Sequence, residues 1–301
     1  FYLYYSYNTD KLILRYIKLV GGNEIKGGSI RIYDGREKIN FADGDAVILF
    51  FTIISNNKAS RGGGIYANGN IKIYNSSIVN NIATTVGGGL SIQHSLMKIY
   101  GSNISNNEAE KGGGGGLVIK YSNVIVQDTT ISFNTAFNTP HADAKGGGMS
   151  ILYSIVIVQD TTISFNRCKD AGGGLYLFGN SGSWGTRSNQ AIINITSCTF
   201  NNNEITRNAA GNVPGGGALY FRGNIIATIR ETSFISNMAK NNQGHAICAK
   251  RKNSAGIPTI SIINTYFNDL TESNLLYDYD NEASNIYGTG RIANWQNCSS
   301  N

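Results

Sequence analysis

The sequence repeats one short pattern along most of its length, and this repetition limits the available folds more than any other feature. A cluster of glycines precedes a short apolar stretch, and further on an Ile or Phe stands three positions before an asparagine. Seven asparagines fit the pattern: Asn57, Asn81, Asn107, Asn134, Asn166, Asn203 and Asn237. They are spaced 24, 26, 27, 32, 37 and 34 residues apart. Periods of about 20–50 residues indicate solenoids, propellers or repeat arrays.

Residue content excludes helical repeats. The apolar stretches are rich in Ile, Val, Tyr and Thr, the chain has 37 glycines, and no segment shows the 3.6-residue apolar spacing of an amphipathic helix. A propeller blade needs four antiparallel strands in about 40–45 residues, whereas each repeat here has room for two or three short strands. The pattern therefore predicts a parallel β-helix in which each repeat forms one coil.

Stacking of coils assigns a structural role to each conserved position of the pattern. Neighbouring coils lie about 4.7–4.9 Å apart, so equivalent residues lie directly above one another. The Ile and Phe positions then form an apolar column inside the coil, and the asparagines form a ladder of amide hydrogen bonds at a corner. The glycines permit positive φ where the backbone turns sharply.

We expect one domain, because a solenoid grows without a new core. It divides into an N-terminal cap with a first irregular coil (1–49), the regular β-helix (50–268) and a C-terminal cap or tail (269–301). Within the first part, 12–20 is either an amphipathic helix or an edge strand. Polar, glycine-rich inserts are predicted to be loops: 137–145, 178–190, 206–214 and 250–258.

Several features suggest an extracellular or cell-surface protein. No apolar segment approaches the roughly 20 residues of a membrane-spanning helix. The chain lacks an initiator methionine and a cleavable signal pattern, so we expect a mature or partial sequence. Four sequons make Asn75, Asn103, Asn194 and Asn297 candidates for N-glycosylation.

The four cysteines lack the spacing of a zinc site. Cys168 occupies the small corner position that is alanine in other repeats, so we expect it to be buried. Cys248 and Cys298 are a candidate disulfide that would tie the C-terminal tail to the last coil.

The repeat resembles that of chlamydial polymorphic outer membrane proteins and related adhesin-like right-handed β-helices. The resemblance rests on Phe200-Asn201-Asn202-Asn203, Gly216-Gly217-Ala218-Leu219 and Phe234-Ile235-Ser236-Asn237, with Ile replacing Phe in five earlier repeats. It covers about 62–237. The resemblance implies a right-handed fold, surface display, adhesion and no enzymatic activity.

Parallel β-helices also include polysaccharide lyases and hydrolases, so a pectin-lyase-like enzyme using a carboxylate or calcium face is the alternative. Aligning the repeats predicts one column: Asn75, Gly101, Asp128, Asp160, Ser197, Glu231 and Asn264. Asp128 and Asp160 would be neighbours there, where they either bind calcium or, as products of one internal duplication, point into solvent. We favour the second reading. The scattered His94, His141 and His245 have no identifiable carboxylate partner.

The sequence thus predicts an all-β protein, a right-handed single-stranded parallel β-helix of about eight coils with irregular end caps. We expect a non-enzymatic structural or adhesive protein, either a rigid surface rod that displays loops and N-glycans or a building block of a surface filament. Expected partners are further copies of the chain, neighbouring surface proteins, glycans or a receptor. The net charge of +6 is spread thinly, so we expect no nucleic-acid partner, and we expect no cofactor, metal or catalytic residue.

Overall fold

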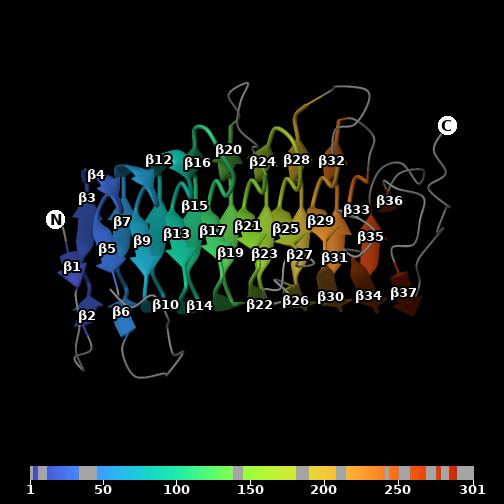
Figure 1. Cartoon of the computed structure of the whole chain (residues 1–301), viewed down its shortest axis with the longest axis horizontal. Helices are drawn as coiled ribbons and strands as arrows, with labels where there is room; N and C mark the ends of the chain where they lie inside the picture. Colours follow the sequence, from blue (N-terminus) through green and yellow to red (C-terminus); the bar gives the residue numbers. More distant parts are fainter. Residues whose placement is uncertain are drawn as a thin grey trace.

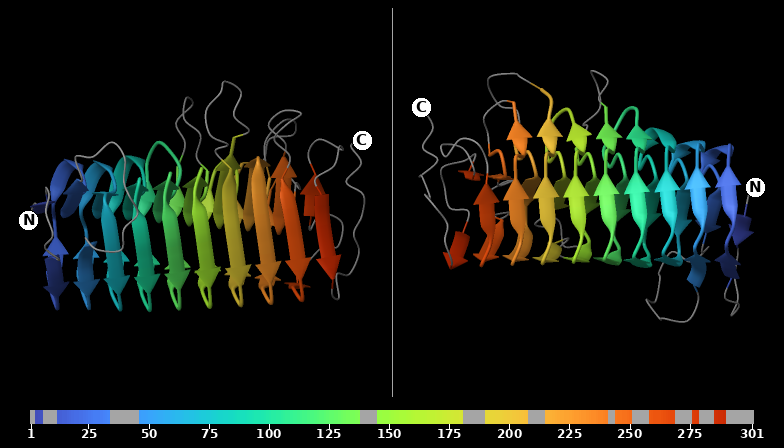
Figure 2. Two further views of the ribbon diagram at one scale, coloured as in Figure 1. Left: turned by 60° about the horizontal axis from the view of Figure 1, so that its bottom comes forward. Right: turned by 180° about the vertical axis from the view of Figure 1, so that it is seen from behind.

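The computed structural model describes residues 3–5, 12–33, 46–137, 145–180, 190–207, 215–240, 244–250, 258–268, 276–278 and 285–289. In this part the chain winds into stacked coils whose strands form four parallel sheets, A to D (Figures 1 and 2). Each coil visits the sheets in the order A, B, C, D. The all-β, right-handed parallel β-helix predicted from the repeat is confirmed.

The strands have the following bounds. Sheet A contains β1 (Leu3–Tyr5), β5 (Ile30–Tyr33), β9 (Ile65–Asn68), β13 (Leu90–Gln93), β17 (Leu117–Lys120), β21 (Met149–Leu152), β25 (Leu175–Gly179), β29 (Leu219–Gly223), β33 (Ile247–Lys250) and β36 (Leu276–Asp278). Sheet B contains β2 (Leu12–Arg15), β6 (Ala46–Phe50), β10 (Asn70–Tyr74), β14 (Leu96–Tyr100), β18 (Asn123–Gln127), β22 (Ile155–Gln159), β26 (Ala191–Thr196), β30 (Ile225–Arg230), β34 (Thr259–Ile263) and β37 (Asn285–Thr289).

The other two sheets are built from shorter strands. Sheet C contains β3 (Lys18–Val20), β7 (Ile53–Ser55), β11 (Ser77–Val79), β15 (Asn103–Ser105), β19 (Thr130–Ser132), β23 (Thr162–Ser164), β27 (Thr199–Asn201), β31 (Ser233–Ile235) and β35 (Tyr266–Asn268). Sheet D contains β4 (Asn23–Lys26), β8 (Lys58–Arg61), β12 (Ile82–Val86), β16 (Glu108–Ala109), β20 (Thr135–Ala136), β24 (Arg167–Cys168), β28 (Glu204–Ile205) and β32 (Met238–Ala239).

One coil consists of four consecutive strands, one from each sheet in the order A to D. Coil 1 is therefore β1–β4, coil 2 is β5–β8, and coil 8 is β29–β32. Eight coils have all four strands in the described part of the chain, in agreement with the predicted number. The prediction of two or three strands per coil is wrong, because the strands of sheet D in coils 4 to 8 are only two residues long. Strands this short leave no visible period-2 pattern in the sequence.

The core consists of apolar columns that run along the stack, two from sheet A, two from sheet B and one from sheet C, and the inward residues of sheet D form a separate small cluster. Residue-for-residue register holds from coil to coil, as in the pairing of Ile104 with Ile131 and of Ile131 with Ile163. All three side chains are fully buried. The Ile and Phe columns predicted from the repeat are therefore present.

The corners between sheets B and C and between sheets C and D share a two-residue construction, which also occurs between sheets A and B in coils 4 to 6. The first residue has positive φ and its side chain points outward, and the second is a short polar residue that points inward and hydrogen-bonds to the next coil. At the corner between sheets B and C the inward residues are hydroxyls and one thiol: Thr52, Ser76, Ser102, Thr129, Thr161, Cys198 and Thr232. At the corner between sheets A and B they are Ser95, Ser122 and Ser154, and between C and D they are the seven asparagines.

Glycine clusters form the return from sheet D to sheet A. A Cβ added at Gly88 would come within 2.2 Å of the Gly115 carbonyl oxygen and within 2.5 Å of the Glu108 backbone nitrogen. Only a residue without a side chain fits, because the backbone of the next coil and the adjoining strand of sheet D pass directly against it. The glycine clusters are thus packing positions as well as turns.

Edge strands form the N-terminal end of sheets B and C. Of the two alternatives for 12–20, the edge strand is observed, because β2 and β3 are the outermost strands of sheets B and C. Two further strands, β36 and β37, lie in the segment 269–301. Most of each predicted loop insert lies outside the described residues. In the part of the chain that the structure describes, no helix has the length and apolar character needed to cross a membrane.

Candidate functional site

The seven asparagines lie in one buried column at the corner between sheets C and D. The Nδ2 of each of the first six donates a hydrogen bond to the Oδ1 of the next asparagine at 2.9–3.0 Å. Each backbone N–H also donates to that same oxygen, as from Asn107 to Asn134 at 3.0 Å. The second Nδ2 hydrogen binds a carbonyl of an earlier coil, as from Asn134 to Ile104 at 2.9 Å. The ladder thereby satisfies buried backbone groups as well as its own amides.

The residue before each ladder asparagine forms an outward-pointing row, which we call the corner row: Asn56, Asn80, Asn106, Phe133, Phe165, Asn202 and Ser236. Every member has φ between 51° and 56°. Asparagine tolerates this left-handed conformation, whereas a bulky side chain there is strained. Four asparagines in the row are therefore expected, and the two phenylalanines are exceptions.

The two exceptional phenylalanines are adjacent and exposed. The rings of Phe133 and Phe165 stack with 4.9 Å between centroids and 2° between planes, an offset arrangement favoured by the ring quadrupole. Their exposed fractions are 53% and 41%. A second exposed and stacked pair with positive φ, Tyr16 and Phe51, lies at the corner between sheets B and C.

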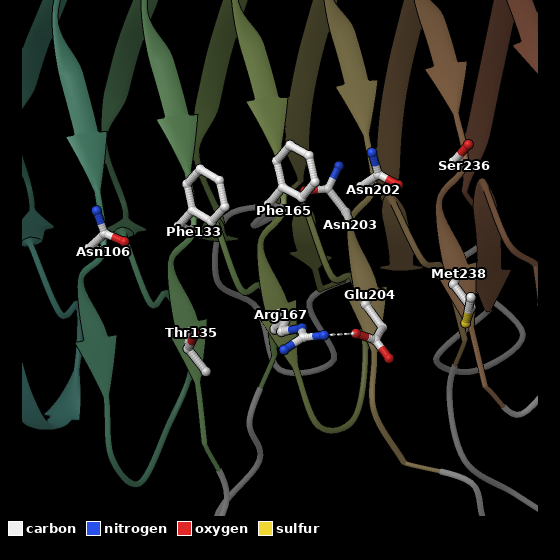
Figure 3. A pocket seen from close by; sticks show the side chains of 10 residues that line it. All are labelled: Asn106, Phe133, Thr135, Phe165, Arg167, Asn202, Asn203, Glu204, Ser236 and Met238. Atoms are coloured by element: carbon white, nitrogen blue, oxygen red, sulfur yellow. Dashed lines mark ion pairs between the residues drawn. The ribbon is translucent and has the colours of Figure 1, made fainter.

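An open groove of about 540 Å³ runs along this corner (Figure 3). Its lining residues are Asn106, Phe133, Thr135, Phe165, Arg167, Asn202, Asn203, Glu204, Ser236 and Met238. Figure 3 shows the corner row along one side and the residues that follow the ladder asparagines along the other. The lining comes from coils 4 to 8, so the groove is elongated parallel to the axis of the stack.

A cluster of charges lies on the sheet D side of the groove. Glu204 bridges two cations, with its Oε2 2.8 Å from an Arg167 nitrogen and its Oε1 3.0 Å from Lys240 Nζ. The Glu204 side chain is 13% exposed, whereas those of Arg167 and Lys240 are 62% and 44% exposed. One carboxylate cannot neutralise two cations, so this cluster keeps a net positive charge that faces solvent.

The carboxylate column predicted from the aligned repeats lies elsewhere, at the corner between sheets B and C. Its seven members all have φ between 46° and 55° and occupy the outward position of that corner. Asp128 and Asp160 are exposed and belong to adjacent coils, since Asp128 N–H donates to the carbonyl of Gln159. Among the described residues, no group of three or more His, Cys, Asp or Glu side chains is placed to hold a metal ion.

The other predicted sites are dispersed. Asn75 and Asn194 are exposed, Asn103 is half-buried, and Asn297 lies outside the described residues. Cys248 is buried beside Tyr176 and Tyr220, while Cys298 also lies outside the described part, so the disulfide stays a prediction.

The prediction that Cys168 is buried is confirmed. Its side chain is 1% exposed, its thiol donates to the carbonyl of Ala171, and burial raises its pKa to about 12.

The two described histidines, His94 and His245, lie at different corners of the stack. His94 is exposed at the corner between sheets A and B, where partial burial and the charge of Lys120 lower its pKa. His245 Nδ1 accepts a hydrogen bond from the backbone N–H of Ala239 at 3.1 Å, and burial lowers its pKa. His141 lies outside the described residues.

The groove itself was not found from sequence. The usable signal was the replacement of asparagine by phenylalanine directly before Asn134 and Asn166. Arg167 and Glu204 each follow a ladder asparagine directly and pair in register in sheet D, whereas Lys240 stands two residues beyond the equivalent position, Met238.

No protein-family model matches the chain, and a search of curated proteins found no match. The resemblance to polymorphic outer membrane proteins is therefore supported only at the level of a parallel β-solenoid. A search of solved structures matched the crystal structure of an alginate lyase from Paenibacillus sp. str. FPU-7, with a TM-score of 0.41 and 11% identity. The match covers 91% of this chain and 98% of that chain.

The expectation that this chain is not an enzyme is corrected by that comparison, because the matched structure is an enzyme. A match at this level assigns no reaction to this chain.

Proposed function

We propose that this protein binds an extended, negatively charged polysaccharide along the groove beside the asparagine ladder. The observation that carries the proposal is the exposed Phe133–Phe165 pair facing the Arg167–Glu204–Lys240 cluster across one open groove. Shape, stacking and charge each favour such a ligand.

The shape of the groove suits a linear polymer. Its walls repeat once per coil, and coils are about 4.8 Å apart, which is close to the length of one pyranose unit in an extended chain. Five successive coils line the groove. A polysaccharide lying along the axis would therefore meet an equivalent wall position with each sugar.

The aromatic pair suits the apolar face of a sugar ring. Pyranose C–H groups pack against aromatic rings, and exposed phenylalanine offers such a surface without a competing hydrogen bond. Asn106, Asn202 and Ser236 lie in the same row and supply amide and hydroxyl groups for sugar hydroxyls. This combination of a few stacking rings with polar groups is typical of a carbohydrate site.

The charge of the groove favours an acidic sugar. Arg167 and Lys240 share one carboxylate, so a uronate carboxylate would gain an ion pair with either cation. An arginine side chain also binds carboxylates through two parallel hydrogen bonds. The chain as a whole carries a net charge of +6, which adds to the attraction.

The proposal includes an extracellular location. It is supported by the exposure of Asn75 and Asn194 within their sequons. Binding along the side of a rod would suit an adhesive role at a cell surface. Assembly into a filament stays a prediction from the sequence.

The test is calorimetric titration with oligogalacturonate and with a neutral cello-oligosaccharide of equal length. We expect the oligogalacturonate to bind more tightly. The double variant Phe133→Asn, Phe165→Asn should lower affinity for both ligands about tenfold or more, since each lost stacking contact costs about 0.5–1.5 kcal/mol. The fold should persist, because asparagine occupies the same position in four other coils.

Phe51→Asn is the matched control. Phe51 is also exposed (48%) and has φ of 48°, but it lies at the corner between sheets B and C. Its substitution should leave affinity unchanged. Absence of binding by both oligosaccharides, or an equal loss in the Phe51 control, would refute a polysaccharide site in this groove.

Cleavage of the bound chain is the second candidate function. It is favoured by the position of Glu204, a carboxylate between two cations on the groove wall. Elimination from a uronate needs a base and a cation that neutralises the substrate carboxylate. Ultraviolet absorbance of an unsaturated product would reveal this reaction, and Glu204→Gln would test the residue. A flat absorbance trace during prolonged incubation with tightly bound oligogalacturonate would restrict the function to binding.

A further inference from the structure

A second recess lies on the outer face of sheet A, away from the groove. The outward row of this sheet contains, in register, Tyr66, Ser91, Val118, Ser150, Tyr176 and Tyr220. Three consecutive coils thus carry small residues between coils that carry tyrosine. The surface is recessed where the side chains of this row are small.

The recess has a volume of about 340 Å³, within the range of about 300–1,000 Å³ typical of small-molecule sites. It is lined by Val86, Gly113, Val118, Lys145, Ser150, Leu152, Tyr176, Phe178 and Arg222. These come from coils 3 to 8 and from the glycine-rich returns between sheets D and A. The lining is mainly apolar and aromatic, with the charged groups at only two positions.

Both charged groups in the lining are cationic and lie over aromatic rings. Lys145 Nζ is 5.3 Å from the ring centre of Tyr176, and the Arg222 guanidinium is 5.8 Å from that of Phe178. Lys145 is only 8% exposed, and lysine is seldom so buried. The Nε atom of Arg222 is buried and forms no hydrogen bond within the described part of the chain.

No carboxylate is among the nine lining residues. Arg222, whose buried Nε has no hydrogen-bond partner in the described part of the chain, favours an anion beside it, because its own hydration is reduced. The buried hydroxyl of Ser150 forms part of the floor and adds a hydrogen-bond donor.

From these features we infer that the recess on sheet A is a binding site for a small organic anion, a carboxylate or sulfonate attached to an aromatic or aliphatic body. The apolar body packs against Val118, Leu152 and the two rings, and the acidic group lies toward Arg222. This site is independent of the proposed polysaccharide groove, since the two share no lining residue.

The experiment compares two fluorescent probes of similar shape, 8-anilinonaphthalene-1-sulfonate and the uncharged N-phenyl-1-naphthylamine. Both brighten on entering an apolar site, but only the first carries an acidic group. We expect the sulfonate to bind at least about tenfold more tightly, a difference of about 1.4 kcal/mol. Equal affinities, or no binding of the sulfonate, would overturn the proposal.

Two substitutions assign the binding to this recess. Arg222→Met keeps the length of the side chain and removes its charge, so it should weaken sulfonate binding about tenfold and leave the uncharged probe unaffected. Ser150→Tyr should fill the recess and abolish binding of both probes, and tyrosine is already accommodated in this row at Tyr176 and Tyr220.

The groove variant Phe133→Asn, Phe165→Asn is the control and should bind both probes as the unaltered protein does. If Ser150→Tyr does not fold, Arg222→Met still decides the question. A folded Ser150→Tyr variant with unchanged sulfonate affinity, or an Arg222→Met variant that keeps its preference for the sulfonate, would overturn the assignment.

Discussion

At the residue scale, each ladder asparagine serves three coils. Asn134 accepts hydrogen bonds from the backbone N–H and Nδ2 of Asn107, and it donates to Ile104 of one coil and to Asn166 of the next. A hydroxyl at this position could not do the same, because it has a single donor hydrogen. This explains why the corner between sheets C and D uses asparagine while the other two corners use serine and threonine.

Replacement of one ladder residue should therefore be costly. Asn134→Leu would leave the Asn107 N–H and the Ile104 carbonyl without partners in the interior. We expect a loss of about 2–5 kcal/mol in the free energy of unfolding, since each such group costs about 1–3 kcal/mol. Denaturant titration measures it. Asn123→Leu, the same change on the outer face of β18, is the control, and equal losses in the two variants would contradict the role of the ladder.

His245 should make stability depend on pH. It stands where the repeat has glycine, and burial lowers its pKa from 6.5, so the folded state favours the neutral ring whose Nδ1 accepts the Ala239 N–H. The unfolded chain then binds more protons in this range, and stability rises with pH. The contribution is complete above about pH 6.5 and is lost as pH falls toward the lowered pKa.

The measurement for this prediction is the free energy of unfolding between about pH 8 and about pH 5. His245→Gly should reduce the decline on acidification relative to the unaltered protein. Parallel curves for the two proteins would show that His245 titrates alike in both states.

At the element scale, each corner works as a column that spans many coils. Thr129 N–H donates to Thr161 Oγ1 at 3.4 Å, and Thr161 Oγ1 donates to the carbonyl of Gln159 at 2.7 Å. Cys198 takes the next position of this column and donates its thiol to Thr196. Burial raises its pKa to about 11, so it stays a thiol at neutral pH and acts as a weaker member of the column.

Restoring a hydroxyl at that position should stabilise the protein. A thiol is a weak donor and acceptor, so Cys198→Thr should raise the free energy of unfolding by about 0.5–1 kcal/mol, the net value of one ordinary hydrogen bond. Denaturant titration of the variant tests this. Cys198→Ala serves as the comparison and should destabilise, and a threonine variant less stable than the unaltered protein would count against the hydroxyl column.

The position of each two-residue strand of sheet D is fixed by the chain segments on either side of it. They are held between the asparagine ladder on one side and the glycine-rich returns on the other. Within the described residues sheet D ends at β32.

At the scale of the whole molecule, the strands of each described coil pair only with those of the coils before and after it, and the ion pair between Lys58 and Glu110 reaches from coil 2 to coil 4. Stability in such an array is a sum of coil terms and nearest-neighbour terms, and end coils lack one neighbour. We expect amide hydrogen exchange to be slowest in coils 4 to 7 and faster in coil 1, including the edge strands β2 and β3. Mass spectrometry of peptic fragments measures this profile, and uniform protection from coil 1 to coil 7 would contradict it.

Much of this architecture was predictable from the chain, but the proposed sites were not. The aligned repeats placed Ile131 inside, Asn134 at a corner and Asp128 in an outward column, because identical neighbours stack at a fixed spacing. Phe133 stands in the same alignment, but the repeat pattern does not mark it as a residue of a site. The groove beside it, and the Arg167–Glu204 ion pair on the wall of that groove, are not visible in the sequence.

By itself, the sequence determined the fold class, the number of complete coils and the inward columns, since all of these follow from a local pattern repeated in register. The tertiary structure decided which outward side chains form ion pairs and which line a groove or a recess. The charges of Arg167, Glu204 and Lys240 come from three coils separated by inserts of unequal length, and the recess on sheet A depends on small residues in three others. Such contacts run across coils, and their partners are set by the loop lengths and the angle at each corner, which no single repeat encodes.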